Sequence, residues 1–350
     1  MDKENEGAGS SRPTSEVQRE ARPTGIGPQR VAGARREPLP WHRPKELEDD
    51  PLAQERVQAI LGGPSYRLAD EDVDFLARDD LRPVRLQLDY HKTQLQLLQH
   101  GVEHTIVVFG STRITEPAAA RRALRQLQAQ ADVERGADPS VQAQLARQIA
   151  IAQRIESKSH YYEIARELGQ RIARAGNGPN DTRVMVMTGG GPGIMEAANR
   201  GAFDIGAKSI GLNIALPHEQ YPNPYITPEL CLRFHYFALR KLHFMLRARA
   251  LVAFPGGYGT FDELFETLTL IQTQKIAPVP VVLVGAEYWR RAFDVDFLVD
   301  EGVIAAEDRE LFWYAESAVE IWDGIVRWHQ DNGTPLYPPA GAGSTPTGRG

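Results

Sequence analysis

Two glycine-rich segments, each placed directly between a short apolar run and a helical pattern, constrain most strongly what this chain can fold into. The first reads TGGGPGIME over residues 188–196, and the second reads PGGYGTFDE over residues 255–263. A short apolar run bounded by glycine is typical of a buried strand. A chain that twice passes from such a strand through glycines into a helix is built from strand–helix units, which indicates the α/β class.

Apolar runs and helical patterns alternate over most of the chain. We expect strands at residues 105–109, 184–187, 209–214, 230–234, 251–254 and 279–283. We expect helices at residues 161–175, 194–203, 236–249, 261–273, 288–301 and 319–330. Strands that are continuously apolar are buried on both faces, so the pattern predicts a Rossmann-like, doubly wound parallel sheet. Ligands of such sheets bind at the carboxyl ends of the strands, where both glycine segments lie.

The sequence divides into four parts. Residues 1–45 are rich in Gly, Pro, Ser and charged side chains, and we expect a disordered extension there. Residues 46–101 have helical periodicity and are expected to form an N-terminal helical cap. Residues 102–332 form the predicted α/β domain, with a largely exposed helical insertion at about 117–159 that is interrupted near 136–139. The remaining residues, 333–350, are expected to be a disordered tail.

Composition argues against several kinds of partner and of structural site. The net charge of −6 over 350 residues gives no electrostatic reason to expect a nucleic-acid binder, and the alternative is a local basic pocket, on which net charge has no bearing. The single cysteine, Cys231, rules out an internal disulfide and a Cys-rich zinc site. No apolar stretch approaches the roughly 20 residues of a membrane span, and the first residues lack a signal sequence. We therefore expect a cytoplasmic protein that binds neither nucleic acid nor membranes.

Both glycine segments are candidates for binding a phosphate. Glycine lets backbone N–H groups approach a ligand, and a helix N-terminus favours an anion; the alternative is that they only form tight turns. The candidate residues are Gly189, Gly190, Gly191, Gly193, Gly256, Gly257, Tyr258, Gly259 and Thr260. Neither segment has a Walker A sequence or the spacing of a dinucleotide fingerprint. A mononucleotide or a sugar phosphate is the ligand that fits this pattern best.

One carboxylate stands out beside the second segment. We expect Glu263 in the first turn of the following helix, where the positive end of the helix would keep it ionised. An ionised carboxylate there suits a general base, a nucleophile or a stabiliser of a developing cation. The alternative is an acid that merely stabilises the helix terminus.

Basic residues near the same sheet edge complete the candidate site. Arg240 and Lys241 lie in the helix expected at 236–249, and either can face the ligand or belong to a solvated basic face. Gly110, Ser111 and Arg113 follow the first strand and can reach a phosphate or a base. The histidines are not at metal-ligand spacing, so we predict no metal site.

On these residues the chain resembles the Lonely Guy (LOG) family of nucleoside 5′-monophosphate phosphoribohydrolases over about residues 105–330. The second segment matches the family's PGGxGTxxE motif, the Arg240–Lys241 pair matches its upstream Arg-Lys pair, and GGGPGIM matches its first glycine loop. The family is often labelled lysine decarboxylase, but no pattern here supports a pyridoxal phosphate site. The long helical insertion and both terminal extensions depart from short family members.

The resemblance implies hydrolysis of the N-glycosidic bond of AMP or a cytokinin riboside 5′-monophosphate, as in cytokinin biosynthesis, without a cofactor or a metal. It implies that Glu263 and Arg240 are the catalytic pair. It implies substrate contacts for Lys241, Glu219 and the 256–260 loop, with Thr269 as a further candidate. AMP is the expected substrate because of the departures, and a homodimer or larger homo-oligomer is expected. The alternative is a non-catalytic nucleotide or cofactor carrier of the same fold.

Overall fold

The structure, a computed structural model, describes residues 45–136, 138–216 and 221–337. The chain divides into two compact units, residues 1–71 and 72–350. This division falls inside the segment predicted as one helical cap over 46–101. Of the predicted terminal extensions, residues 1–44 and 338–350 lie outside the described residues.

The first unit contains one α-helix among its described residues, α1 (Ala53–Leu61). The helix ends at Leu61, and Gly62 is its C-cap. Ala53 is its buried residue, and the other α1 side chains are exposed.

The second unit is built on a seven-stranded parallel sheet, which confirms the predicted α/β class. Its strands are β1 (His104–Phe109), β2 (Val184–Thr188), β3 (Ile210–Ile214), β4 (Cys231–Phe234), β5 (Ala248–Ala253), β6 (Val281–Val284) and β7 (Trp313–Ala315). Their order is β4-β3-β2-β1-β5-β6-β7. The chain winds outward from β1 to β4 and then restarts beside β1 at β5, so the topological switch point lies between β1 and β5.

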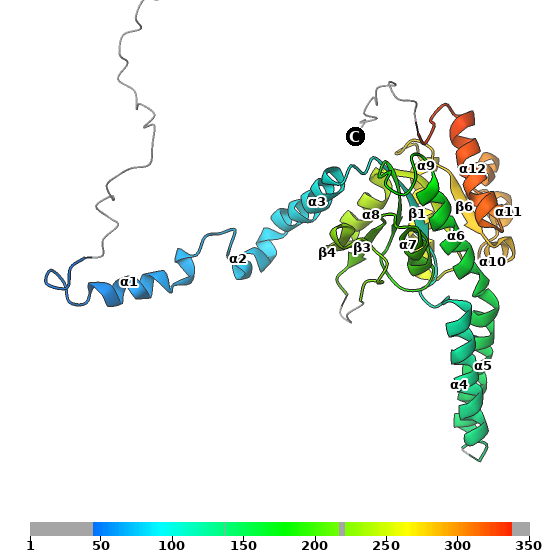
Figure 1. Ribbon diagram of the computed structural model, residues 1–350, viewed down its shortest axis with the longest axis horizontal. Coiled ribbons are helices and arrows are strands. Elements are labelled where there is room, and N and C mark those ends of the chain that lie inside the picture. Colours follow the sequence, from blue (N-terminus) through cyan, green and yellow to red (C-terminus); the bar gives the residue numbers. More distant parts are fainter. Residues whose placement is uncertain (1–44, 137, 217–220, 338–350) are drawn as a thin grey trace, which may run out of the picture. The chain divides into compact units, whose positions relative to one another are not determined.

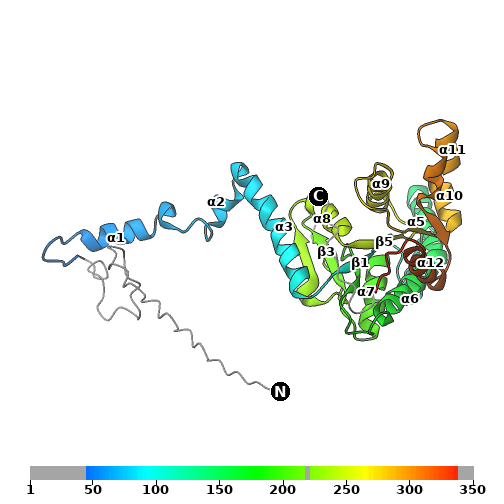
Figure 2. The ribbon, with the colours of Figure 1, turned by 90° about the horizontal axis from the view of Figure 1, so that it is seen from above.

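Helices cover both faces of this sheet (Figures 1 and 2). One face packs against α6 (His160–Arg174), α7 (Ile194–Asp204) and α12 (Ala318–Asp331). The other packs against α3 (Arg82–Gln99), α8 (Phe237–Leu246), α9 (Tyr258–Gln272) and α10 (Ala286–Ala292). Two further helices are short: α2 (Val73–Ala77) and α11 (Val295–Asp300). The core is therefore two apolar layers, one on each side of the strands.

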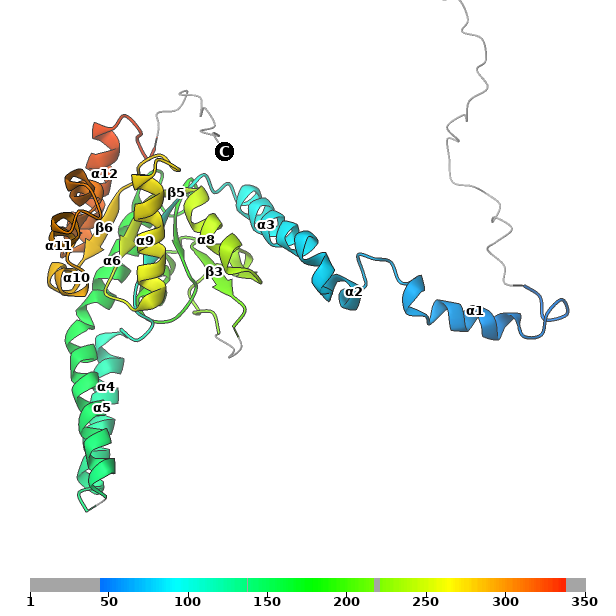
Figure 3. The same cartoon turned by 180° about the vertical axis from the view of Figure 1, so that it is seen from behind.

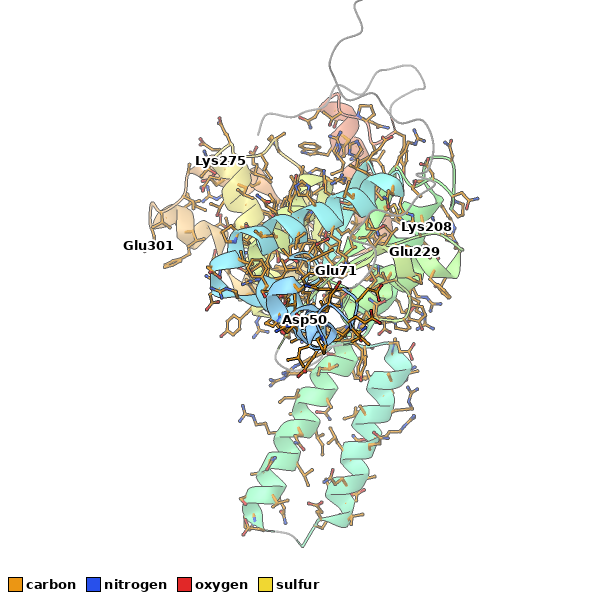
Figure 4. All side chains as sticks on the ribbon, turned by 90° about the vertical axis from the view of Figure 1, so that its left-hand side faces the viewer. Asp50, Glu71, Lys208, Glu229, Lys275 and Glu301 are labelled. Atoms are coloured by element: carbon orange, nitrogen blue, oxygen red, sulfur yellow. The ribbon has the colours of Figure 1, made fainter. Side chains whose placement is uncertain are left out.

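The predicted insertion is a helical hairpin. Helix α4 (Pro117–Val133) and helix α5 (Pro139–Lys158) run side by side (Figure 3), and the break between them is where the sequence predicted it. Side chains project outward around both helices (Figure 4), and most of them are exposed, as expected. No helix of the described residues is long and apolar enough to cross a membrane.

Two helix predictions are wrong in their bounds, and one strand was not predicted. The helix expected at 236–249 ends at Leu246, because Ala248 already pairs with β1 in the sheet. The helix expected at 288–301 is two helices, since the Asp294 side chain accepts hydrogen bonds from the N–H groups of Asp296 and Phe297 and starts α11 anew. The strand that was not predicted is β7, which has three residues and lies at the edge of the sheet.

The start of the predicted tail is packed. Leu336 is 5% exposed and joins the core on the α6, α7 and α12 face. Tyr337 lies under the guanidinium of Arg183, 5.2 Å from its ring centroid. The packed chain therefore extends beyond Gly333, where the tail was predicted to begin.

Candidate functional site

A cavity of about 590 Å³ opens at the carboxyl ends of β1 and β5, at the switch point of the sheet. This volume is typical of a small-molecule site. Most of the lining comes from the loop after β1, the second glycine segment with α9, and α5 of the hairpin, and α7, α8 and α10 contribute one residue each. The predicted site residues that line it are Gly110, Ser111, Arg113, Arg240, Gly256, Gly257, Tyr258, Gly259, Thr260 and Glu263.

The second glycine segment forms the rim of this cavity and the start of α9. Gly257 is the N-cap, and its carbonyl accepts hydrogen bonds from the N–H groups of Thr260 and Phe261. The N–H groups of Tyr258 and Gly259, which come before these, have no intrahelical acceptor, and both residues line the cavity. The segment therefore presents backbone donors and the positive end of a 15-residue helix to any ligand.

The shape of this rim depends on one glycine. A Cβ at Gly256 would lie 2.1 Å from the Oγ1 of Thr260, so a larger residue would push the loop off the helix. The hydroxyl of Tyr288, on α10, donates a hydrogen bond to the Gly256 carbonyl and holds the loop from the other side. Thr260 is thus the third residue of α9, packed under the loop, and does not act as the N-cap.

Glu263 is buried in the cavity wall. Helix α9 begins at Tyr258, three residues earlier than predicted, so Glu263 lies in the second turn and is 5% exposed. Burial raises the pKa of its carboxyl from 4.5 to about 7, against the lowering effect of the Arg240 and Lys241 charges. The expectation of a fully ionised Glu263 is therefore wrong near pH 7, where both protonation states are populated, because the effect of burial exceeds that of the neighbouring cations.

Arg240 reaches the same cavity from α8. Asp89 on α3 accepts hydrogen bonds from the N–H groups of His235 and Tyr236, at 2.8 and 3.0 Å, and so fixes the start of α8. One turn later, the Nε of Arg240 donates to the Leu212 carbonyl at 2.7 Å. Burial lowers the pKa of this guanidinium, and the Glu263 charge raises it again.

The first glycine segment supports the site from behind. None of its candidate residues, Gly189, Gly190, Gly191 and Gly193, lines the cavity. A Cβ at Gly189 would lie 2.5 Å from Arg240 Nη2, so glycine makes room for the guanidinium. Asn223 secures the loop through its Nδ2, which donates to the Gly191 carbonyl, and its N–H, which donates to the Gly190 carbonyl. Contact between this loop and a ligand stays a prediction.

Other predicted contacts lie elsewhere. Lys241 bridges α8 and α9: its Nζ is 3.0 Å from Asp262 Oδ1 and 2.9 Å from Glu266 Oε2. Thr269 is on the outer face of α9, where its hydroxyl donates to the Phe265 carbonyl. Neither residue lines the cavity. Glu219 lies outside the described residues.

Several lining residues were not predicted. They include Ile114, Met195, Tyr288 and three residues of the hairpin, Ile151, Ile155 and Lys158. A signal for the hairpin residues was present, because their spacing of four and three residues places them on one face of α5. Nothing in the sequence distinguished Tyr288 from an ordinary helical aromatic residue.

Comparison with known proteins places this geometry in a family. Residues 195–325 match a family described as "Possible lysine decarboxylase". Cytokinin riboside 5′-monophosphate phosphoribohydrolase LOG of Oryza sativa is 30% identical over 168 residues, which are 47% of this chain and 65% of that protein. Cytokinin riboside 5′-monophosphate phosphoribohydrolase LOG1 of Arabidopsis thaliana is 31% identical over 170 residues, which are 47% of this chain and 75% of that protein.

A solved structure, the Moco carrier protein from Chlamydomonas reinhardtii, has 22% identity and a TM-score of 0.33, covering 49% of this chain and 89% of that one. The two phosphoribohydrolases named above align at 30% and 31% identity, and LOG1 does so over three quarters of its length. The family match runs from α7 to α12 and includes both Arg240 and Glu263. This chain belongs to the LOG family.

Proposed function

We propose that this chain hydrolyses the N-glycosidic bond of a nucleoside 5′-monophosphate, releasing the free base and ribose 5-phosphate. The observation that carries the proposal is the position of Glu263: a carboxyl with a pKa of about 7, buried in a cavity whose rim is a helix N-terminus. A carboxyl that titrates near neutral pH can accept a proton and return it. The names of the LOG relatives support a substrate of this class.

The phosphate of the substrate binds at the rim in this proposal. The first-turn N–H groups of α9 and the hydroxyl of Thr260 supply donors there, and Arg113 supplies a charge. A phosphate anchored at the rim positions the ribose along the cavity wall, so binding energy remote from the reacting bond is used for orientation. Gly110 and Ser111 line the same side and bound the space that remains for the sugar.

The chemistry takes place at the ribose C1′ atom in this proposal. Ionised Glu263 accepts a proton from a water molecule, the water oxygen bonds to C1′, and the C1′–N bond breaks. The departing base takes up a proton, which the protonated Glu263 can supply, so the carboxylate is restored. Arg240, fixed by the Leu212 carbonyl, holds its remaining N–H donors toward the ribose hydroxyls and stabilises the ionised form of Glu263.

A base-release assay tests this proposal. Purified protein is incubated with AMP, a cytokinin riboside 5′-monophosphate, other monophosphates, and adenosine as the control without phosphate. We expect release of the base from a monophosphate, with AMP preferred, and none from adenosine. Glu263→Gln should abolish turnover and leave AMP binding nearly unchanged. Tight AMP binding without base release from any nucleotide would instead support the carrier alternative.

Two further properties belong to the proposal. We expect the active form to be a homodimer or a larger homo-oligomer, which light scattering on the purified full chain measures directly. We also expect turnover after exhaustive treatment with a chelator, because the proposed steps use only Glu263, Arg240 and water. Loss of activity that returns with one added metal ion would contradict this mechanism.

A further inference from the structure

We propose that Lys158, at the end of helix α5, binds the phosphate of the substrate, so that the inserted hairpin is part of the substrate site. The identity of the ligand as a nucleoside monophosphate rests on the proposed function. The role of Lys158 rests on separate observations: its place in the cavity wall, the charges around it, and the way the hairpin is attached to the sheet.

One face of the last two turns of α5 lines the cavity, and Lys158 is its last member. Ile151, Ile155 and Lys158 are four and three residues apart, which is the spacing of one helix face. Short members of the family lack such an insertion, so the family motifs contain no counterpart of these residues. The two isoleucines give the cavity an apolar side, and Lys158 adds a cation where α5 meets the sheet domain.

The charges in the wall leave Lys158 available for an anion. Arg240 has Glu263 near it, which offsets its charge. Within the described part of the chain, no carboxylate pairs with the side chain of Lys158 or with that of Arg113. A phosphate monoester carries nearly two negative charges at pH 7. Two unpaired cations and a helix N-terminus around one cavity match that charge.

A purely structural role does not explain why Lys158 lies in the cavity wall. Lys158 is in the last turn of α5, and a cation there is favourable to the helix dipole by about 0.3–1 kcal/mol. That gain is available on any face of the helix, including the exposed faces. The dipole therefore accounts for a lysine near this position and does not account for its place in the cavity wall.

The root of the hairpin is held firmly against the sheet domain. Arg200 on α7 donates to Glu116, the N-cap of α4, at 2.8 Å. The hydroxyl of Tyr162, just after α5, donates to Glu196 of α7 at 2.8 Å. These contacts fix both ends of the hairpin next to the cavity. The backbone at Lys158 is therefore already in place when a ligand binds, and only its side chain has to become ordered.

Calorimetric titration with three ligands, inorganic phosphate, AMP and adenosine, tests the proposal. Glu263→Gln is introduced into every protein compared, so that AMP is not hydrolysed during the titration. We expect Lys158→Gln to weaken binding of inorganic phosphate and AMP by about tenfold, the usual scale for losing one charge-assisted hydrogen bond, and to leave adenosine unchanged. Lys158→Arg should restore most of the affinity. The matched control is Arg154→Gln, one turn earlier on the same side of α5, because Arg154 is exposed and does not line the cavity; this substitution should leave all three affinities unchanged.

Two results would overturn the proposal. In one, Lys158→Gln binds phosphate and AMP as the protein that keeps Lys158 does, so that Lys158 only terminates α5. In the other, all three ligands weaken together with a fall in Tm, so that the substitution disturbs the hairpin generally. Because every readout is binding, a native protein that releases no base refutes the proposed hydrolysis and leaves the result on Lys158 intact.

Discussion

Glu263 and Arg240 face the same cavity, and burial moves their pKa values in opposite directions. It raises the pKa of the Glu263 carboxyl to about 7 and lowers that of the Arg240 guanidinium, while each charge favours the charged form of the other. The arginine therefore helps to keep the pKa of this buried carboxyl near 7, so that both of its protonation states are populated at neutral pH. This is the range in which a proton-transfer group is most effective.

The first prediction concerns the pH dependence of the reaction. If ionised Glu263 is the general base, kcat/KM should rise with pH and reach half its maximum near pH 7. Below that point it should fall about tenfold for each pH unit. A profile measured from pH 5 to 9 checks this, and a flat profile across pH 6–8 would remove Glu263 from the role of base.

The second prediction uses the bridge made by Lys241. Its charge lowers the pKa of Glu263 and that of Glu266 raises it, although neither side chain lines the cavity. Lys241→Met should move the acidic limb of the profile to higher pH, and Glu266→Gln should move it to lower pH, each by up to about one pH unit.

The control for this pair is Lys275→Met, an exposed lysine at the end of α9 (Figure 4), which should leave the profile in place. KM for AMP should stay nearly constant in Lys241→Met. A large rise in KM with an unmoved profile would mean that Lys241 contacts the substrate, as the family resemblance implies.

The third prediction concerns stability. A carboxyl whose pKa rises on folding binds more protons in the folded state, so its contribution to stability falls as pH rises from about 4.5 to about 7. Glu263→Gln removes that penalty. Its free energy of unfolding should equal that of the native protein near pH 4.5 and exceed it by up to roughly 3 kcal/mol above pH 7.

Denaturant unfolding at several pH values measures this difference. Glu301→Gln, at an exposed position at the end of α11 (Figure 4), serves as the control and should show no such trend. If Glu263→Gln is no more stable than the native protein at pH 8, folding does not raise the pKa of the Glu263 carboxyl.

Apolar runs between glycines were enough to predict six of the strands and the placing of both glycine segments at the carboxyl edge. They did not predict the different environments of the two segments. Both read as strand, glycines and helix, yet Gly256 borders the cavity while Gly189 lies under Arg240. The difference arises from partners far away in the chain, because Asn223 and α8 pack on the first segment and α10 on the second. Local sequence carries no record of such partners.

The prediction that Glu263 is ionised failed for a similar reason. Its neighbours in the sequence place it near a helix N-terminus, which favours charge. Its burial depends on α8 and on the loop after β1. The sequence predicts that both lie at the same edge of the sheet, but it does not predict how closely they pack around Glu263. Desolvation, which is decided by tertiary packing, proved to be the larger effect.

The fourth prediction compares two neighbouring glycines. Gly256→Ala forces a methyl group into Thr260, and overpacking of this kind costs about 1–3 kcal/mol and displaces the rim. At Gly257 a Cβ meets nothing within 4 Å and the backbone has a negative φ, so Gly257→Ala should fold normally. Thermal unfolding should separate the two variants, and equal Tm values would mean that the loop is not packed as described.

The fifth prediction concerns the hydrogen bond from Tyr288 to the Gly256 carbonyl. Tyr288→Phe keeps the ring and removes the hydroxyl, leaving the carbonyl without its donor. We expect a loss of about 0.5–1.5 kcal/mol in the free energy of unfolding and a severalfold rise in KM for AMP, because the rim that receives the phosphate becomes less fixed. The value of kcat should change little, since Glu263 and Arg240 are untouched. Tyr221→Phe, at an exposed tyrosine, is the matched control. If Tyr288→Phe lowers kcat and leaves KM unchanged, the hydroxyl acts on the reacting groups and not on the rim.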